Sequence, residues 1–187
     1  MSKRKISALI AAGASIFIFI SLFSNSILSR SERNRSIGIG FTEVEECRGS
    51  RCRSVSIIKY ERDLGPVGSG LWWFQFVVAL GGFAVLGRRF LADNTVEAQK
   101  KVDKYHLSQM IAAVIGLLIV VGWMVALKNL HGLKRMHLTA GTSFYTGTFG
   151  YLLAIASFAV MKMDHGEGLD APQLSPPPPS PDAPPVN

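Results

Sequence analysis

Four long apolar stretches of this chain lack Asp, Glu, Lys, Arg and His altogether. They are residues 6–28, 71–87, 107–127 and 138–161. Ionisable side chains within apolar segments are typical of pumps, proton relays and coupled transporters, so their absence weighs against these classes. A small passive channel lined by hydroxyl groups or by backbone remains an alternative.

Catalytic and metal-binding motifs are also lacking. No nucleophile elbow, phosphate-binding loop, zinc-protease motif or kinase signature occurs. Two cysteines without a nearby histidine or a second pair make a poor zinc site. His106 and His137 are expected at opposite ends of the apolar segments, and His131 is close to His137, so no two of them face each other across helices to bind a haem. We therefore predict a non-enzyme without catalytic residues, metal or cofactor.

The apolar stretches are long enough to be transmembrane helices, since about 20 helical residues cross the roughly 30 Å hydrocarbon core of a bilayer. The sequence predicts an all-α membrane protein, a four-helix bundle with spans at about 6–28, 69–91, 107–127 and 138–161. Trp72 and Trp73 would anchor the second span at one surface, and Arg88 and Arg89 would reach out to the other. A cleaved signal peptide is the alternative for the first span.

Proline is nearly missing from the predicted membrane domain, residues 1–162, which contains Pro66 alone of the nine prolines. The other eight lie in residues 163–187, with a run at 176–179. This composition predicts a disordered cytoplasmic tail with polyproline II character. The tail either docks in an aromatic groove of a partner or is simply solvated.

Residues 29–68 form the longest polar loop, with eight Lys/Arg and six Asp/Glu. Because its positive and negative charges are interleaved, no nucleic-acid partner is expected. Alternation of apolar and polar residues at 37–42 and 53–59 predicts a β-hairpin within residues 36–60. The four residues 48–51, which include Gly49, would form its turn.

Cys47 and Cys52 flank that turn and would face each other across the strand pair. A disulfide between them would stabilise the hairpin by about 2 kcal/mol. Two free thiols, a metal site and an active redox dithiol are the alternatives, although the spacing is not Cys-x-x-Cys and no helix N-terminus is predicted nearby. A disulfide needs an oxidising compartment, so it would place the loop outside the cytoplasm.

Two sets of residues are candidate contact sites. Arg48, Arg51 and Arg53 lie at the predicted hairpin tip, where they either contact a partner or form a solvated turn. In the fourth span, small residues recur every four positions, which is typical of a helix-packing face in a bilayer. These residues are Thr142, Thr146, Gly150 and Ala154. Such a face would pack within the chain or against a second copy.

Four spans place both termini on the same side of the membrane. With a cytoplasmic N-terminus, 9 Lys/Arg lie inside and 11 outside, so the positive-inside rule does not favour this orientation. The basic residues 3–5 directly before the first span and the expected disulfide favour it instead. We predict cytoplasmic N- and C-termini in a plasma membrane or a bacterial inner membrane.

This layout resembles the superfamily of claudins, peripheral myelin proteins and calcium-channel gamma subunits. The resemblance rests on four spans, a long first loop with a cysteine pair, a short second loop, and residues 38–41 (Gly-Ile-Gly-Phe) in the place of the family's Gly-Leu-Trp segment. It implies a disulfide between Cys47 and Cys52 and a small β-sheet above the bilayer. The chain departs from the family in having no tryptophan in this loop and in the closeness of its cysteines.

From these features we expect a non-enzymatic integral membrane protein that acts in adhesion or barrier formation, in lateral assembly, or as an accessory subunit. Its first loop would contact another membrane protein or a second copy of the chain. The alternatives are a membrane redox component that uses Cys47 and Cys52, and a small passive channel.

Overall fold

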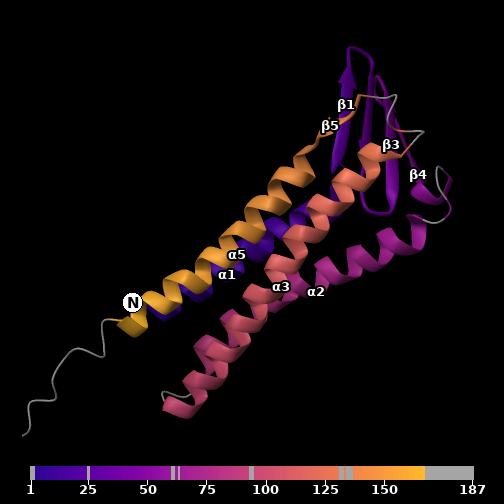
Figure 1. The fold of residues 1–187 in the computed structure, drawn as a ribbon. Helices are drawn as coiled ribbons and strands as arrows, with labels where there is room; N and C mark the ends of the chain where they lie inside the picture. The colour runs from indigo at the N-terminus through magenta and orange to yellow at the C-terminus, as the bar shows by residue number, and fades with distance from the viewer. Residues whose placement is uncertain are drawn as a thin grey trace, which may run out of the picture.

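Four long helices and a small antiparallel sheet make up the fold in the computed structural model (Figure 1). The structure describes residues 3–24, 26–59, 62, 64–92, 95–130, 133 and 137–166. The helices are α1 (Lys3–Phe23), α2 (Leu64–Leu91), α3 (Val96–Asn129) and α5 (Thr142–Gly166). The strands are β1 (Leu28–Glu32), β2 (Arg35–Ile39), β3 (Glu43–Arg48), β4 (Arg51–Ser56) and β5 (Thr139–Ala140), and a 3₁₀ helix, η1, covers Ile57–Lys59.

The sheet lies at one end of the helix bundle, which we call the sheet end; the opposite end is the distal end (Figure 1). α1 and α3 run toward the sheet, whereas α2 and α5 run away from it. Both ends of the described chain, Lys3 and Gly166, therefore lie at the distal end. All four helices are long and apolar enough to cross a membrane.

Each helix buries a stripe of residues spaced mostly three and four apart. In α3 the stripe is Val102, His106, Gln109, Ala113, Gly116, Val120, Trp123 and Leu127. This repeat keeps one face of a helix toward its neighbours along the whole bundle. Glycines let the backbones approach closely, since a Cβ on Gly82 would lie 2.6 Å from the Ala11 carbonyl oxygen and one on Gly150 would lie 2.9 Å from that of Ala14.

The small-residue face predicted on α5 coincides only partly with its buried stripe. The predicted positions are Thr142 (exposed), Thr146 (partly buried), Gly150 and Ala154 (both buried). Gly150 packs against Ile18 of α1, within the same chain. The buried stripe alternates between steps of four and three, because a strict spacing of four drifts around a helix of 3.6 residues per turn.

The sheet has the strand order β4-β3-β2-β1-β5, and all neighbouring strands are antiparallel. β1 to β4 follow one another between α1 and α2. β5 comes from the connection between α3 and α5, and it pairs with the base of β1 through Leu28–Ala140 and Ser29–Thr139. The sheet thus combines strands from the connection between α1 and α2 with a strand from the connection between α3 and α5.

Several element boundaries differ from those predicted. Residues 138–141 are not helical, because β5 lies there and α5 begins at Thr142. α1 ends at Phe23 because the chain enters β1 at Leu28. The alternating run 37–42 belongs to β2 and the bend after it, so the partner of β4 is β3 rather than that run. α5 continues to Gly166, and the rest of the predicted tail, 167–187, lies outside the described residues.

The bend between β2 and β3 fixes the sheet to the bundle. The ring of Phe41 stacks on the ring of Trp123 in α3, with centroids 6.3 Å apart. The indole Nε1 of Trp123 also donates a hydrogen bond to the carbonyl of Gly40 at 3.5 Å. Gly68 of α2 lies so close to this bend that a Cβ there would overlap the carbonyl oxygen of Phe41. The sheet therefore contacts both α2 and α3.

A serine cluster joins the end of α1 to the start of α5. The backbone N–H of Ser26 donates to Ser143 Oγ at 3.2 Å, and the N–H of Ser143 donates to Ser26 Oγ at 3.2 Å. Ser143 Oγ in turn donates to the carbonyl of Ser24. These bonds satisfy backbone groups at two helix ends that water would otherwise have to reach.

Candidate functional site

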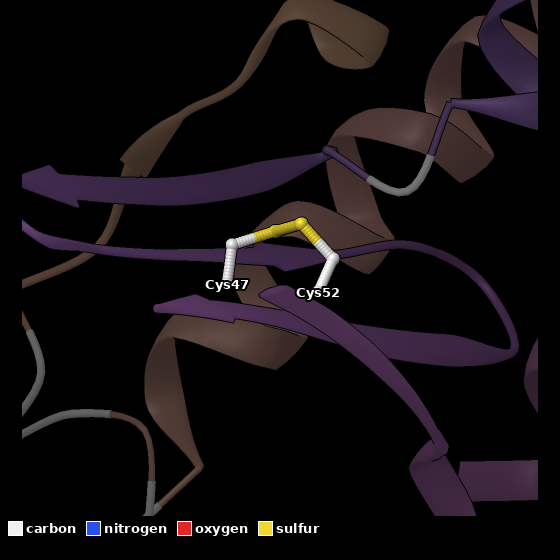
Figure 2. Close-up of a disulfide and its surroundings, with 2 residues drawn as sticks. All are labelled: Cys47 and Cys52. Carbon is white, nitrogen blue, oxygen red and sulfur yellow. A yellow bond between two sulfur atoms is a disulfide. The ribbon is translucent and has the colours of Figure 1, made fainter. Parts of the chain in front are cut away.

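The hairpin of β3 and β4 carries the two cysteines. Cys47 and Cys52 pair directly in the strand register, at a Cα–Cα distance of 4.0 Å and a disulfide S–S distance of 2.06 Å (Figure 2). Arg48 pairs with Arg51, so the turn consists of Gly49 and Ser50 alone instead of the four residues predicted. Gly49 has a φ of 60°, which glycine adopts readily in such a turn.

The three candidate contact arginines, Arg48, Arg51 and Arg53, are exposed on this hairpin. In the register, Arg53 is opposite Glu46, so the two strands present opposite charges side by side. Glu45 lies within 4.8 Å of both sulfur atoms. A metal would need the cysteines as thiolates, and the disulfide takes up both sulfurs.

β4 is an edge strand, and no strand in the described part of the chain pairs with its outer side. The two residues that flank a two-residue turn exchange main-chain hydrogen bonds. In β4, every second residue from Arg51 onward therefore bonds to β3. In agreement, the N–H of Ile57, six residues later, donates to the carbonyl of Thr42 at 2.9 Å. Ser54 is not in this series of alternate residues, so its main-chain N–H and C=O point away from β3. The outer edge of β4 offers unpaired main-chain groups.

A second group of polar side chains is buried near the distal end, between α2, α3 and α5. We call Arg89, Gln99, Asp103, His106 and Ser157 the buried polar cluster. Arg89 is only 3% exposed and is ion-paired with Asp103. Its Nη1 also donates a hydrogen bond to Gln99 Oε1 at 2.6 Å. Arg89 thus joins α2 to the first turns of α3, and removal of Asp103 would leave a buried charge without its counter-charge.

Histidine and glutamine side chains continue this polar layer along α3. His106 Nε2 lies 2.9 Å from Ser157 Oγ of α5. The hydroxyl of Ser157 donates to the carbonyl of Ala154 at 2.7 Å, so the imidazole is the donor to Ser157. One turn further along α3, Gln109 donates to the carbonyl of Val78 in α2 at 2.7 Å. Hydrogen bonds from the side chains of His106 and Gln109 therefore link three helices inside the bundle.

The expectation that Arg88 and Arg89 both reach the membrane surface was wrong for Arg89. Arg88 is exposed, with its guanidinium carbon 3.6 Å from the centroid of the Tyr105 ring, whereas Arg89 turns inward. Helical periodicity could have indicated that Arg89 is buried, because Arg89 continues the buried stripe of α2. That stripe includes Gln75, Val78, Gly82, Val85 and Arg89.

His106 and His137 are far apart in the fold. His106 lies in the distal part of α3, whereas His137 lies next to β5 at the sheet end. They cannot share a haem between them. His131 lies outside the described residues.

No protein-family model and no curated protein matches this chain.

Proposed function

We propose that this chain is a non-enzymatic integral membrane protein whose helices lie in the bilayer and whose sheet lies outside the cytoplasm. The surface of the bundle supports this, because large apolar side chains are exposed on each helix. Examples are Ile20, Val77, Leu118 and Phe149, and Leu118 is 67% exposed. Apolar surface of this extent is unfavourable in water and is covered by lipid tails in a membrane.

Aromatic side chains fit the two surfaces of such a bilayer. Near the sheet end, Trp73 is 61% exposed and packs on Trp72 and Phe76. Near the distal end, Tyr105 is exposed on α3. Along α3, Tyr105 and Trp123 are about 27 Å apart at 1.5 Å per residue. This distance is close to the thickness of a hydrocarbon core. Tyr105 and Trp123 therefore lie at the heights expected for aromatic residues at the two membrane surfaces.

The disulfide and the basic N-terminus support the proposed orientation. A disulfide between Cys47 and Cys52 persists outside the cytoplasm, and Lys3, Arg4 and Lys5 at the distal end favour the cytoplasmic side. We expect a membrane-impermeant maleimide to label Cys47 and Cys52 in intact cells only after reduction. Labelling that needs permeabilisation but no reductant would place the sheet in the cytoplasm and contradict this orientation.

We extend the proposal to a distant kinship in architecture with the claudin, peripheral myelin protein and calcium-channel gamma-subunit superfamily. Supporting it are the cysteine pair on neighbouring strands and the sheet carried at the end of four antiparallel helices. The role proposed from this layout is adhesion or barrier formation, lateral assembly, or modulation of another membrane protein.

One observation carries the functional proposal: the outer edge of β4 is exposed, and none of the described strands pairs with it. A partner strand can add to such an edge through main-chain hydrogen bonds, with side chains supplying specificity. Arg51 and Arg53 on this strand would favour a partner strand that carries carboxylates. The partner is another membrane protein or a second copy of this chain.

Substitution of Ser54 tests this edge selectively. Ser54→Pro removes one outward N–H while leaving the ladder to β3 intact, and proline is tolerated at such edge positions. We expect it to lower the yield of cross-linked complexes in intact cells by about tenfold, since a lost hydrogen bond and the proline ring both oppose pairing.

The matched control is Ser54→Ala, which removes the hydroxyl that hydrogen-bonds Glu43 but keeps the N–H. It should cross-link as the wild type does. Equal cross-linking of the wild type and both variants, at equal surface expression, would contradict assembly through β4.

A further inference from the structure

A hollow of about 300 Å³ lies at the distal end, between the last turn of α2 and the first turns of α3. Leu91, Ala92 and Val102 give it apolar walls, and the exposed bases Arg88 and Lys101 also line it. No carboxylate among the described residues lines this hollow, which we call the α2–α3 pocket. Its described lining therefore combines apolar surface with the positive charge of two bases.

The cation of Arg88 is held in a defined position at the pocket. Its guanidinium carbon lies 3.6 Å from the centroid of the Tyr105 ring. Stacking on an aromatic face fixes the planar guanidinium, whose fork of N–H donors suits the binding of an anion. The next residue, Arg89, points into the bundle and is paired with Asp103. Arg88 and Lys101 therefore supply the charge of the pocket.

The described surroundings of the pocket are basic. The described residues at the distal end include nine bases, namely Lys3, Arg4, Lys5, Arg88, Arg89, Lys100, Lys101, Lys104 and Lys162. The acidic side chains described there are Glu97 and Asp103, and Asp103 is paired with Arg89. This excess of positive charge raises the local concentration of anions.

The depth of the pocket in the membrane follows from the length of α3, and this step rests on the proposed function. The 34 residues of α3 measure about 51 Å, against a hydrocarbon core of roughly 30 Å. The first turns of α3, with Lys101, therefore lie beyond the core on the distal side. Tyr105 marks the boundary, so the pocket is level with the lipid headgroups.

We propose that the α2–α3 pocket binds the headgroup of an anionic phospholipid. The phosphate lies between Arg88 and Lys101, where charge-assisted hydrogen bonds hold it. The glycerol and the first acyl carbons lie against Leu91 and Val102. Basic pockets between helices on the cytoplasmic side are suited to such lipids. A free phosphate would use the same bases but would gain nothing from the apolar walls.

The test compares two double variants of the full-length protein that lose the same charge. Arg88→Gln/Lys101→Gln alters the pocket, whereas Lys100→Gln/Lys104→Gln alters exposed bases beside it that do not line it. Each protein is equilibrated in detergent with equimolar phosphatidylglycerol and phosphatidylcholine, and bound lipids are counted by native mass spectrometry. We expect the wild type and the control to retain one phosphatidylglycerol, and the pocket variant to bind it about tenfold more weakly or worse.

The outcomes separate the possible failures. Equal retention of phosphatidylglycerol by both variants would overturn the pocket. Displacement of the lipid by inorganic phosphate at matched concentration would show that the bases bind phosphate alone, and would overturn the lipid proposal. Extraction of the wild type from membranes by alkaline carbonate would overturn the proposed membrane location itself. A chain that stays in the membrane but shows no preference for phosphatidylglycerol would overturn only the inference about the pocket.

Discussion

Replacing Asp103 by leucine is expected to destabilise the protein by about 3–5 kcal/mol, because the substitution leaves Arg89 as a buried charge without its counter-charge. Arg89 is 3% exposed, so water cannot solvate the guanidinium unless α2 and α3 separate. Gln99 would still accept one hydrogen bond, but it carries no charge. The measurement is the free energy of unfolding in a defined detergent, from urea or thermal denaturation.

A compensated variant provides the control for this result. Arg89→Met/Asp103→Leu removes both charges and fills similar volume, so it should recover most of the lost stability. Glu97→Gln, a charge removal in the exposed first turn of the same helix, should change stability by less than about 0.5 kcal/mol. A single Asp103→Leu variant as stable as the wild type would show that Arg89 reaches solvent.

Replacing Gly68 by alanine is expected to cost about 3 kcal/mol, although alanine is the better helix former. A Cβ at this position of α2 would overlap the carbonyl oxygen of Phe41, and backbone cannot rotate aside as a side chain can. The bend that stacks Phe41 on Trp123 would have to move away from the bundle. We expect a lower Tm and faster proteolysis within the sheet.

Gly70→Ala is the matched control, two residues further along the same helix. Nothing lies within 4 Å of a Cβ at Gly70. There the helix propensity of alanine acts alone, and the variant should be more stable than the wild type by about 0.5–1 kcal/mol. Effects of the same sign at both positions would contradict the close approach of α2 to the sheet.

The four helices could be predicted from the sequence because the length of an apolar run is a local property of the chain. A hairpin with Cys47 and Cys52 beside its turn could be predicted for the same reason, although its first strand is β3 rather than the run 37–42 and its turn has two residues rather than four. The start of α5 could not be predicted. Residues 138–141 are compatible with a helix, and β5 forms there only because β1, from a distant part of the sequence, offers a pairing edge.

The buried polar cluster was missed for a different reason. A run of 17 uncharged residues is followed here by two arginines, and composition alone gives no sign of which arginine faces inward. The direction depends on the angular position of Arg89 relative to Gly82 and Val85, and on Asp103 approaching from another helix. Periodicity supplies the first of these facts, but the second requires the packed bundle.

The late position of β5 has a consequence for how the chain is made. β1 to β4 leave the ribosome before α2, and they can pair with one another as soon as they emerge. The main-chain groups at the base of β1, at Leu28 and Ser29, find their partner only when residues 139 and 140 arrive, after α3 is complete. The junction of sheet and helices is therefore completed only after α3 has emerged, and a nascent chain that stalls before β5 presents an open strand edge to chaperones.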